Sequence, residues 1–141
     1  MTETIEIGGI HLRFLQTKEE TEGSLDVFEM IVMPNAQMPV QHYHESWDET
    51  IVGLMGVTTW RVAGKDIELA PGHSLFIKRG TVHGFRNDSA EAASCLCILT
   101  PGALGVGYFR EVAALAAQGA PDLAKMKEVM QRYGLVPAPE Q

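Results

Sequence analysis

The sequence predicts a mainly β protein, a single-domain barrel or sandwich that ends in two helices. Short apolar segments recur about every 8–12 residues between turn residues, which is typical of all-β sandwiches and barrels. From Tyr108 onward the apolar positions follow a helical period instead. A chain of 141 residues is long enough to bury one hydrophobic core, so we expect one domain.

The N-terminal part predicts a hairpin followed by a long strand. Residues 4–7 and 11–16 flank the Gly8-Gly9 pair, a combination typical of a β-hairpin. Residues 25–33 are apolar on both faces of a strand, so both faces should be covered. A second copy of the chain can supply that cover and protect the sheet edges, and we therefore predict a homodimer.

The middle of the chain continues as short strands separated by turns. The expected strands cover residues 49–55, 57–62, 66–69, 74–77, 82–87 and 93–99. Cys95 and Cys97 share one face of the last strand, and cysteines that close rarely form a disulfide. We interpret them as small core residues.

Two amphipathic helices are predicted at the C-terminal end, over residues 108–118 and 122–133. The second helix presents a stripe formed by Leu123, Met126, Met130 and Tyr133. Apolar stripes of this kind pack onto a core. The expected organisation is a barrel over residues 1–104 and a helical extension over residues 105–141 packed on it, one domain overall.

Three histidines and one glutamate form the most informative pattern. His42 and His44 are two residues apart on a predicted strand, so their side chains point to the same face. Glu49 opens the next strand, and His83 opens a later one. Imidazole and carboxylate groups suit borderline divalent metals such as iron, manganese, nickel, copper, cobalt or zinc. The sequence therefore predicts one divalent metal ion per protomer, held by His42, His44, Glu49 and His83.

These residues resemble the two sequence motifs of the cupin family, G-x5-H-x-H-x3-4-E-x6-G and G-x5-P-x-G-x2-H-x3-N. The matching positions are His42, His44, Glu49 and Gly56 in the first motif, and Gly72, Gly80, His83 and Asn87 in the second. Ala36 stands at the leading glycine position and Lys78 at the proline position. Neither departure falls on a predicted metal ligand.

The resemblance implies both a fold and a class of activity. It implies a cupin β-barrel, that is, a double-stranded β-helix or jelly-roll. The tail over residues 108–137 is similar to that of small bacterial cupins that resemble quercetin-2,3-dioxygenase. The activity implied is that of a metal-dependent dioxygenase acting on a small enolisable organic substrate.

The chemistry of the predicted site leaves alternatives open. Three neutral imidazoles, one carboxylate and a divalent ion sum to a charge of about +1, which favours an anionic oxygen such as an enolate. Glu49 can also act as a general base, which makes it the predicted catalytic residue. The alternatives are a metal-dependent isomerase or lyase, and a non-catalytic module that binds a small ligand.

Strand alternation predicts a mostly apolar cavity around the metal. The residues expected to point inward with Glu49 are Ile51, Gly53 and Met55, and those expected to do so with His83 are Phe85 and Asn87. Asn87 is either an outer contact of the site or a strand-end hydrogen bonder. Trp47 lies on the loop before Glu49, where it either gates the entrance or packs at the surface. His73 lies in a turn and should be solvated.

Charge and hydropathy exclude several classes of partner. The net charge of −7 and the sequence pI of about 5.1 disfavour nucleic acid and anionic membranes. No apolar run approaches the length of a membrane span, and residues 1–6 are acidic where a signal peptide is basic. We predict a cytoplasmic protein with a small-molecule substrate and neither a nucleic-acid nor a membrane partner.

Overall fold

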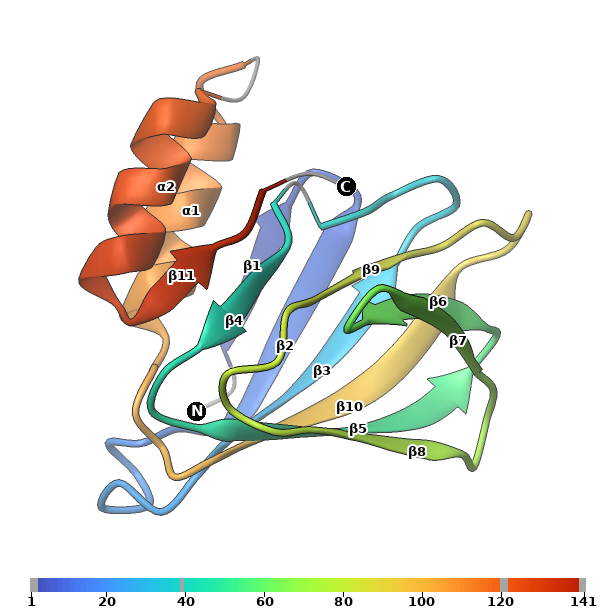
Figure 1. The fold of residues 1–141 in the computed structure, drawn as a ribbon, viewed down its shortest axis with the longest axis horizontal. Coiled ribbons are helices and arrows are strands. Elements are labelled where there is room, and N and C mark those ends of the chain that lie inside the picture. The colour runs from blue at the N-terminus through green and yellow to red at the C-terminus, as the bar shows by residue number, and fades with distance from the viewer. Residues whose placement is uncertain (1–2, 39, 120–121, 140–141) are drawn as a thin grey trace.

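Two antiparallel sheets and two helices make up the computed structural model, which describes residues 3–38, 40–119 and 122–139 (Figure 1). Within these residues, the six-stranded sheet has the order β1 (Glu3–Ile7), β2 (Ile10–Gln16), β3 (Asp26–Val32), β10 (Ala93–Thr100), β5 (Asp48–Met55) and β8 (Ser74–Ile77). The five-stranded sheet has the order β11 (Leu135–Pro137), β4 (His42–His44), β9 (His83–Arg86), β6 (Thr58–Val62) and β7 (Lys65–Leu69). The helices are α1 (Gly107–Ala116) and α2 (Leu123–Arg132). The predicted mainly β fold with two C-terminal helices is confirmed.

The hydrophobic core draws side chains from both sheets. On β3 every second residue is buried, among them Phe28, Met30 and Val32, because successive side chains of a strand point to opposite faces. The five-stranded sheet contributes Trp60 and Phe85, whose ring centroids lie 5.1 Å apart. The two sheets thus share one core.

The predicted N-terminal hairpin is present. β1 and β2 pair antiparallel, with Ile7 opposite Ile10. Gly8 in the turn between them has a φ of 57°, a left-handed conformation that glycine adopts without the steric cost of a Cβ atom. The Gly-Gly pair therefore indicated both the turn and the pairing.

One residue predicted to point inward from β5 points outward instead, because the sheet contains a register shift. Glu49, Ile51 and Gly53 are buried, as strand alternation predicted. The pairing of β10 with β5 is regular up to Cys95 and shifts between Ser94 and Cys95. Such an irregularity breaks the alternation. Met55, which lies beyond the shift, is 52% exposed rather than directed into the cavity.

The helices pack against the edges of the sheets, α1 on β1 and α2 on β11. The Asp122 side chain caps α2 by accepting a hydrogen bond of 3.1 Å from the backbone N–H of Lys125. The stripe on α2 is partly as predicted, since Met126 and Met130 are buried, whereas Leu123 at the first helical residue is 45% exposed. No helix of the described residues is both long and apolar enough to cross a membrane.

After α2 the chain returns to the five-stranded sheet as β11, a strand that the sequence analysis missed. Leu135 pairs opposite His44, and Pro137 pairs opposite His42. β11 is an edge strand, where proline is tolerated because one side of the strand needs no ladder hydrogen bond. Residues of the predicted helical extension thus form part of the five-stranded sheet. They pair with β4, the strand that carries His42 and His44.

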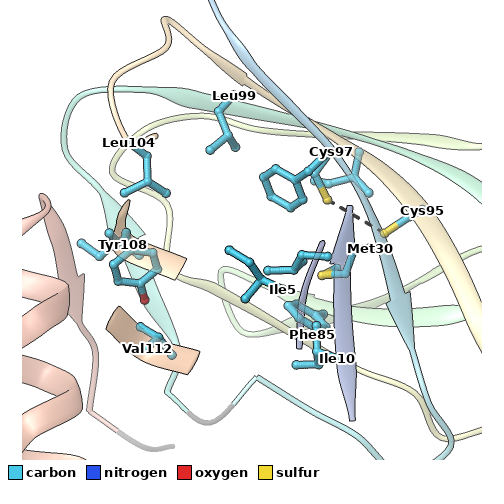
Figure 2. Packing of buried hydrophobic residues seen from close by; sticks show 14 of the residues in the cluster. Ile5, Ile10, Met30, Phe85, Cys95, Cys97, Leu99, Leu104, Tyr108 and Val112 are labelled. Atoms are coloured by element: carbon cyan, nitrogen blue, oxygen red, sulfur yellow. Dashed lines mark hydrogen bonds between the residues drawn. The ribbon is translucent and has the colours of Figure 1, made fainter. Parts of the chain in front are cut away.

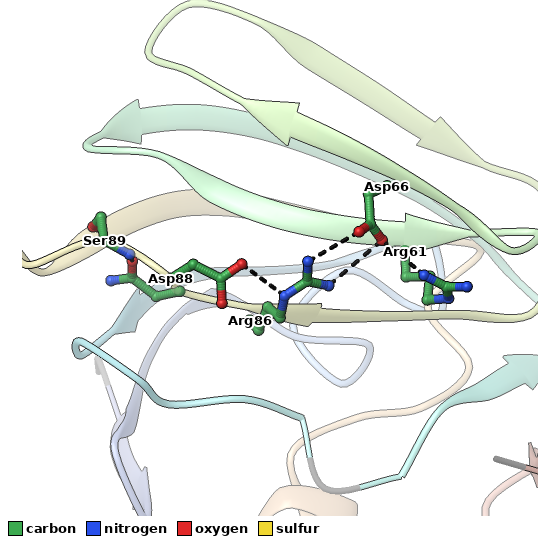
Figure 3. A network of polar contacts seen from close by, with 6 residues as sticks. Arg61, Asp66, Arg86, Asp88 and Ser89 are labelled. Carbon is green, nitrogen blue, oxygen red and sulfur yellow. Dashed lines mark hydrogen bonds and ion pairs between the residues drawn. The ribbon is translucent and has the colours of Figure 1, made fainter. Parts of the chain in front are cut away.

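An exposed ion-pair network joins β6, β7 and β9 (Figure 3). The Asp66 carboxylate accepts hydrogen bonds from Arg86, at 3.0 Å, and from Arg61, at 3.2 Å, while Arg86 also reaches Asp88 at 2.8 Å. Arg86 and then Arg61 hold the pKa of the Asp66 carboxyl below its usual value. Because these groups are solvent-exposed and screened by salt, the network orients the strand edge more than it stabilises the fold.

Candidate metal centre

Three histidine side chains converge in the interior. His42 and His44 come from β4, and His83 comes from β9, where its Cα is the register partner of His42. All three are buried, while Tyr43 between the first two is on the other face and half-buried. One ring nitrogen from each histidine lies within 4.8 Å of the others. This three-histidine group could hold a metal ion.

The spacing of two of these nitrogens fits a common metal ligand shell. The Nε2 atoms of His42 and His44 lie 3.1 Å apart. Two imidazole nitrogens bound about 2.1 Å from one ion at a right angle lie about 3.0 Å from each other. The observed separation therefore suits two adjacent positions around a single ion.

Glu49 lies beside the three-histidine group. Its Oε1 is 3.7 Å from His44 Nε2 and 3.6 Å from His83 Nε2, and the side chain is buried. Its strand β5 belongs to the other sheet, so the four side chains meet across the core. The structure thus brings Glu49 close to two of the three histidines, whereas the group whose ligand atoms all lie within 4.8 Å of one another consists of the histidines alone.

Backbone carbonyls orient two of the imidazoles. His42 Nδ1 lies 3.2 Å from the carbonyl oxygen of Val40, and His83 Nδ1 lies 2.9 Å from that of Thr81. A carbonyl accepts a hydrogen bond only from a protonated nitrogen, so these contacts favour the tautomer with the proton on Nδ1, in which Nε2 carries the lone pair that can bind an ion. Outer contacts of this kind fix the ring orientation at metal sites.

One buried atom of the cluster has no hydrogen-bond partner. Within the described residues, His83 Nε2 is buried and makes no hydrogen bond. A buried polar atom without a partner costs free energy unless it binds something. A metal ion in the cluster satisfies this atom, and on this observation the residues fit a divalent metal.

Burial keeps the imidazoles of His42 and His44 neutral. Desolvation, followed by the nearby His83, lowers the pKa of His42 to about 3. The same causes, together with His42, lower the pKa of His44 still further below its usual value. At neutral pH both rings therefore offer lone pairs rather than protons, which is the state that binds a metal.

A cavity of about 100 Å³ borders the cluster. Its metal-side polar groups are His42, His44 and Glu49. The remaining lining is almost entirely apolar and comes from the strands and both helices; Figure 2 shows part of it, including Met30, Phe85, Leu99, Leu104, Tyr108 and Val112. Apolar cavities with a few polar groups are typical binding sites for small organic molecules.

Comparison with known proteins identifies the family. Residues 28–99 match the family described as the Cupin domain. The chain belongs to the cupin family. Quercetin 2,3-dioxygenase from Bacillus subtilis (strain 168) is 33% identical to this cupin over 90 residues, which cover 64% of this chain and 26% of the relative. The matched part is thus about a quarter of that protein.

Solved structures similar to this cupin confirm the fold class. A predicted oxalate decarboxylase from Thermotoga maritima has a TM-score of 0.64 and 22% identity, with 72% of this chain and 92% of that chain covered. The polyketide cyclase RemF from Streptomyces resistomycificus has a TM-score of 0.62 and 24% identity, with 70% and 73% covered. At this level of sequence identity, the similarity to these two structures indicates a shared fold but not a shared activity.

The structure also places two residues whose roles were open. Trp47 is neither a gate nor a surface residue but is buried, 1% exposed, with its indole stacked on the His44 ring at 4.7 Å between centroids. Asn87 stabilises a loop: its Nδ2 donates to the carbonyl oxygens of Val32 and Glu91, and its Oδ1 accepts from Ser89. Asn87 is therefore the strand-end hydrogen bonder, whereas His73 is exposed as predicted.

Proposed function

We propose that this cupin binds one divalent metal ion through His42, His44, His83 and Glu49 and acts as a dioxygenase on a small enolisable organic substrate. The observation that carries the proposal is the convergence of three buried histidine nitrogens and a carboxylate at the edge of an apolar cavity. The relatedness to a quercetin 2,3-dioxygenase over 90 residues supports the oxygenase chemistry.

Each side chain has a defined task in this proposal. A bound divalent ion supplies Lewis acidity and, if it is redox-active, one-electron chemistry with dioxygen. The three histidines hold the ion, and the carbonyls of Val40 and Thr81 orient the rings of His42 and His83. Glu49 accepts the proton that leaves the substrate as it enolises, while the apolar walls exclude water from the resulting anion.

The cavity lining favours some substrates over others. Within the described residues no lysine or arginine lines it, so a sugar phosphate or a small dicarboxylate finds no compensating cation apart from the metal. The lining therefore argues against a sugar phosphate or a dicarboxylate as the substrate. An isomerase or lyase that acts on an uncharged enolisable molecule remains the second candidate, because the same residues serve it.

Oxygen consumption separates the two candidates. Protein loaded separately with iron, manganese, nickel, copper or cobalt is screened in an oxygen electrode with flavonols and 1,3-dicarbonyl compounds. We expect oxygen uptake with at least one metal, and no conversion of the substrate once oxygen is removed. Conversion at the same rate under anaerobic conditions contradicts the dioxygenase and favours the isomerase or lyase.

We also propose that the protein is a homodimer through the outer face of the six-stranded sheet. This face carries apolar side chains on four strands, interrupted by Glu29, which pairs with Arg13, and by Thr50. The apolar residues are Val27 and Ile31 on β3, Leu96 and Ile98 on β10, Val52 on β5 and Phe76 on β8. Phe76 is 60% exposed. Apolar side chains that are gathered on one face of a sheet are typical of association sites.

Light scattering tests the dimer. The wild type should show twice the 15.4 kDa chain mass at micromolar concentration, and Phe76→Asp should reduce it to the chain mass, because a buried unpaired carboxylate destabilises an apolar interface. Ile67→Asp is the matched control, since Ile67 is 38% exposed on the other sheet and should leave the dimer intact. A monomeric wild type contradicts the proposal.

A further inference from the structure

Tyr108 is a polar residue in the apolar part of the cavity. It lies in the first turn of α1, is 8% exposed, and borders the cavity that the metal cluster also borders. Its ring is held edge-on against Phe109, at 5.0 Å between centroids, and against Tyr133, at 5.6 Å. The hydroxyl lies on the side of Val112, another cavity residue (Figure 2). These contacts hold the ring at the cavity wall.

The Tyr108 hydroxyl makes no hydrogen bond with any described residue. Burial alone raises its pKa above the ordinary value, with no contribution from a hydrogen-bonding neighbour, so the group stays protonated and can donate. Among the described residues, the fully buried side-chain polar atoms without a partner are Trp47 Nε1 and His83 Nε2, so the Tyr108 hydroxyl retains access to solvent or to a molecule in the cavity. Among the described lining residues, Tyr108 is the one polar group outside the metal cluster. A group of this kind is expected to pair with a bound molecule.

The surrounding side chains indicate the shape of that molecule. The cavity is lined by aromatic rings and thioethers, namely Phe28, Phe85, Phe109, Met30, Met38, Met126 and Met130. Aromatic rings pack well against flat ring systems, and methionine adapts to irregular apolar shapes. The lining therefore suits a flat aromatic body better than a flexible polar chain.

We propose that Tyr108 binds an oxygen of an aromatic carbonyl substrate, donating a hydrogen bond to it while a second oxygen of the same molecule faces the metal cluster. The second half of this statement rests on the function proposed above. The first half depends only on Tyr108 and the apolar cavity. The substrate class is thus an aromatic ketone or enol with two oxygen functions, one of which accepts a hydrogen bond from Tyr108.

The test uses a pair of probes that differ in one group. Acetophenone has a carbonyl that accepts a hydrogen bond, whereas α-methylstyrene has the same shape with a methylene in its place. Both are titrated into metal-free wild-type protein and metal-free Tyr108→Phe. We expect acetophenone to bind Tyr108→Phe about fivefold more weakly than the wild type, a typical effect of one neutral hydrogen bond. The affinity for α-methylstyrene should stay within about twofold.

Three further measurements show whether a weaker affinity reflects the lost hydrogen bond or a general change in the protein. Tyr108→Phe should melt at the wild-type temperature or higher, because it removes a hydroxyl that has no partner in the free protein. Tyr133→Phe is the control variant: its hydroxyl donates to Glu111, it does not border the cavity, and the acetophenone affinity should not change. Independently of any variant, the carbonyl stretch of bound acetophenone should shift to lower wavenumber in the wild type.

Equal acetophenone affinity in wild type and Tyr108→Phe, or no binding of either probe to the wild type, overturns the assignment. Metal binding is measured separately, on samples of the same two proteins that have been reloaded with a divalent ion. If the protein binds no metal but the wild type still prefers acetophenone, the proposed function is wrong and Tyr108 remains a ligand contact. Normal metal content with no ketone preference removes the role of Tyr108 alone.

Discussion

The His44→Ala variant should lose almost all of its bound metal. His44 Nε2 lies 3.1 Å from His42 Nε2 and 3.7 Å from Glu49 Oε1, so the change removes a donor that is close to two others. We expect the dissociation constant for a divalent ion to rise by about 100-fold or more, since even outer contacts at metal sites are worth about 10- to 100-fold. Elemental analysis after equilibrium dialysis measures the effect.

His73→Ala is the matched control for this variant. His73 is an exposed histidine in a turn, outside the three-histidine group. Its removal should leave the metal content unchanged. If both variants bind the same amount of metal as the wild type, the assignment of the site is wrong.

Binding should also be visible in stability and fluorescence. A ligand that binds only the folded state at about 100 times its dissociation constant stabilises a protein by about 2.7 kcal/mol, so metal should raise the melting temperature of the wild type and not of His44→Ala. Trp47 is stacked on His44, and a paramagnetic ion held by that ring should quench its fluorescence. Trp47→Phe should abolish the quenching and leave the signal of Trp60, which packs on Phe85.

The parts of the site that the sequence predicted depend on short-range geometry. His42 and His44 share a face because they are two residues apart on one strand, and the cluster in the structure follows this rule. The motif spacing then identified Glu49 and His83, which lie 5 and 39 residues further along the chain. His83 approaches His44 because β9 pairs with β4, and Glu49 approaches it because the two sheets pack face to face. The spacing in a known family encodes both contacts, whereas alternation along one strand does not.

What the sequence could not predict depends on contacts between distant segments. β11 has only three residues and contains a proline, so no strand pattern marks it, yet it pairs with the strand that carries His42 and His44. The adjacent Gly134 has a φ of 87°, a left-handed conformation that glycine adopts without steric cost, and it lies in van der Waals reach of the Trp47 indole. The burial of Trp47 therefore follows from the return of the C-terminus. A loop position alone did not indicate it.

The orientation of Tyr108 is another long-range effect. Helical period predicted an amphipathic segment from this residue onward but not which of its residues would border a cavity. That outcome depends on how α1 packs against β1 and α2. A hydroxyl without a partner in the described residues is recognised only once its neighbours are known.

The Glu49→Gln variant should retain much of its metal and lose turnover. Glutamine has the shape of glutamate and keeps an oxygen that can reach the ion, but it carries no charge and cannot take a proton at neutral pH. We expect metal affinity to fall by about tenfold or less, whereas turnover should fall by about 10²- to 10⁴-fold, the usual contribution of a general base. Metal content and oxygen uptake are measured on the same sample.

The His83→Ala variant shows what loss of the whole site looks like. Comparison with it shows whether Glu49 acts mainly on the metal or mainly on the proton. His83 Nε2 belongs to the three-histidine group and makes no hydrogen bond with a described residue, so removal of this ring should lower metal content and turnover together. A Glu49→Gln protein that turns over at the wild-type rate excludes Glu49 as the base. A variant that loses metal as completely as His83→Ala instead makes the carboxylate mainly a metal ligand. The Glu49 carboxylate lies 3.6 Å from His83 Nε2, and Glu49 also borders the apolar cavity, so it can contact both the ion and the substrate. Comparison of the two variants therefore separates its contribution to metal binding from its contribution to proton transfer.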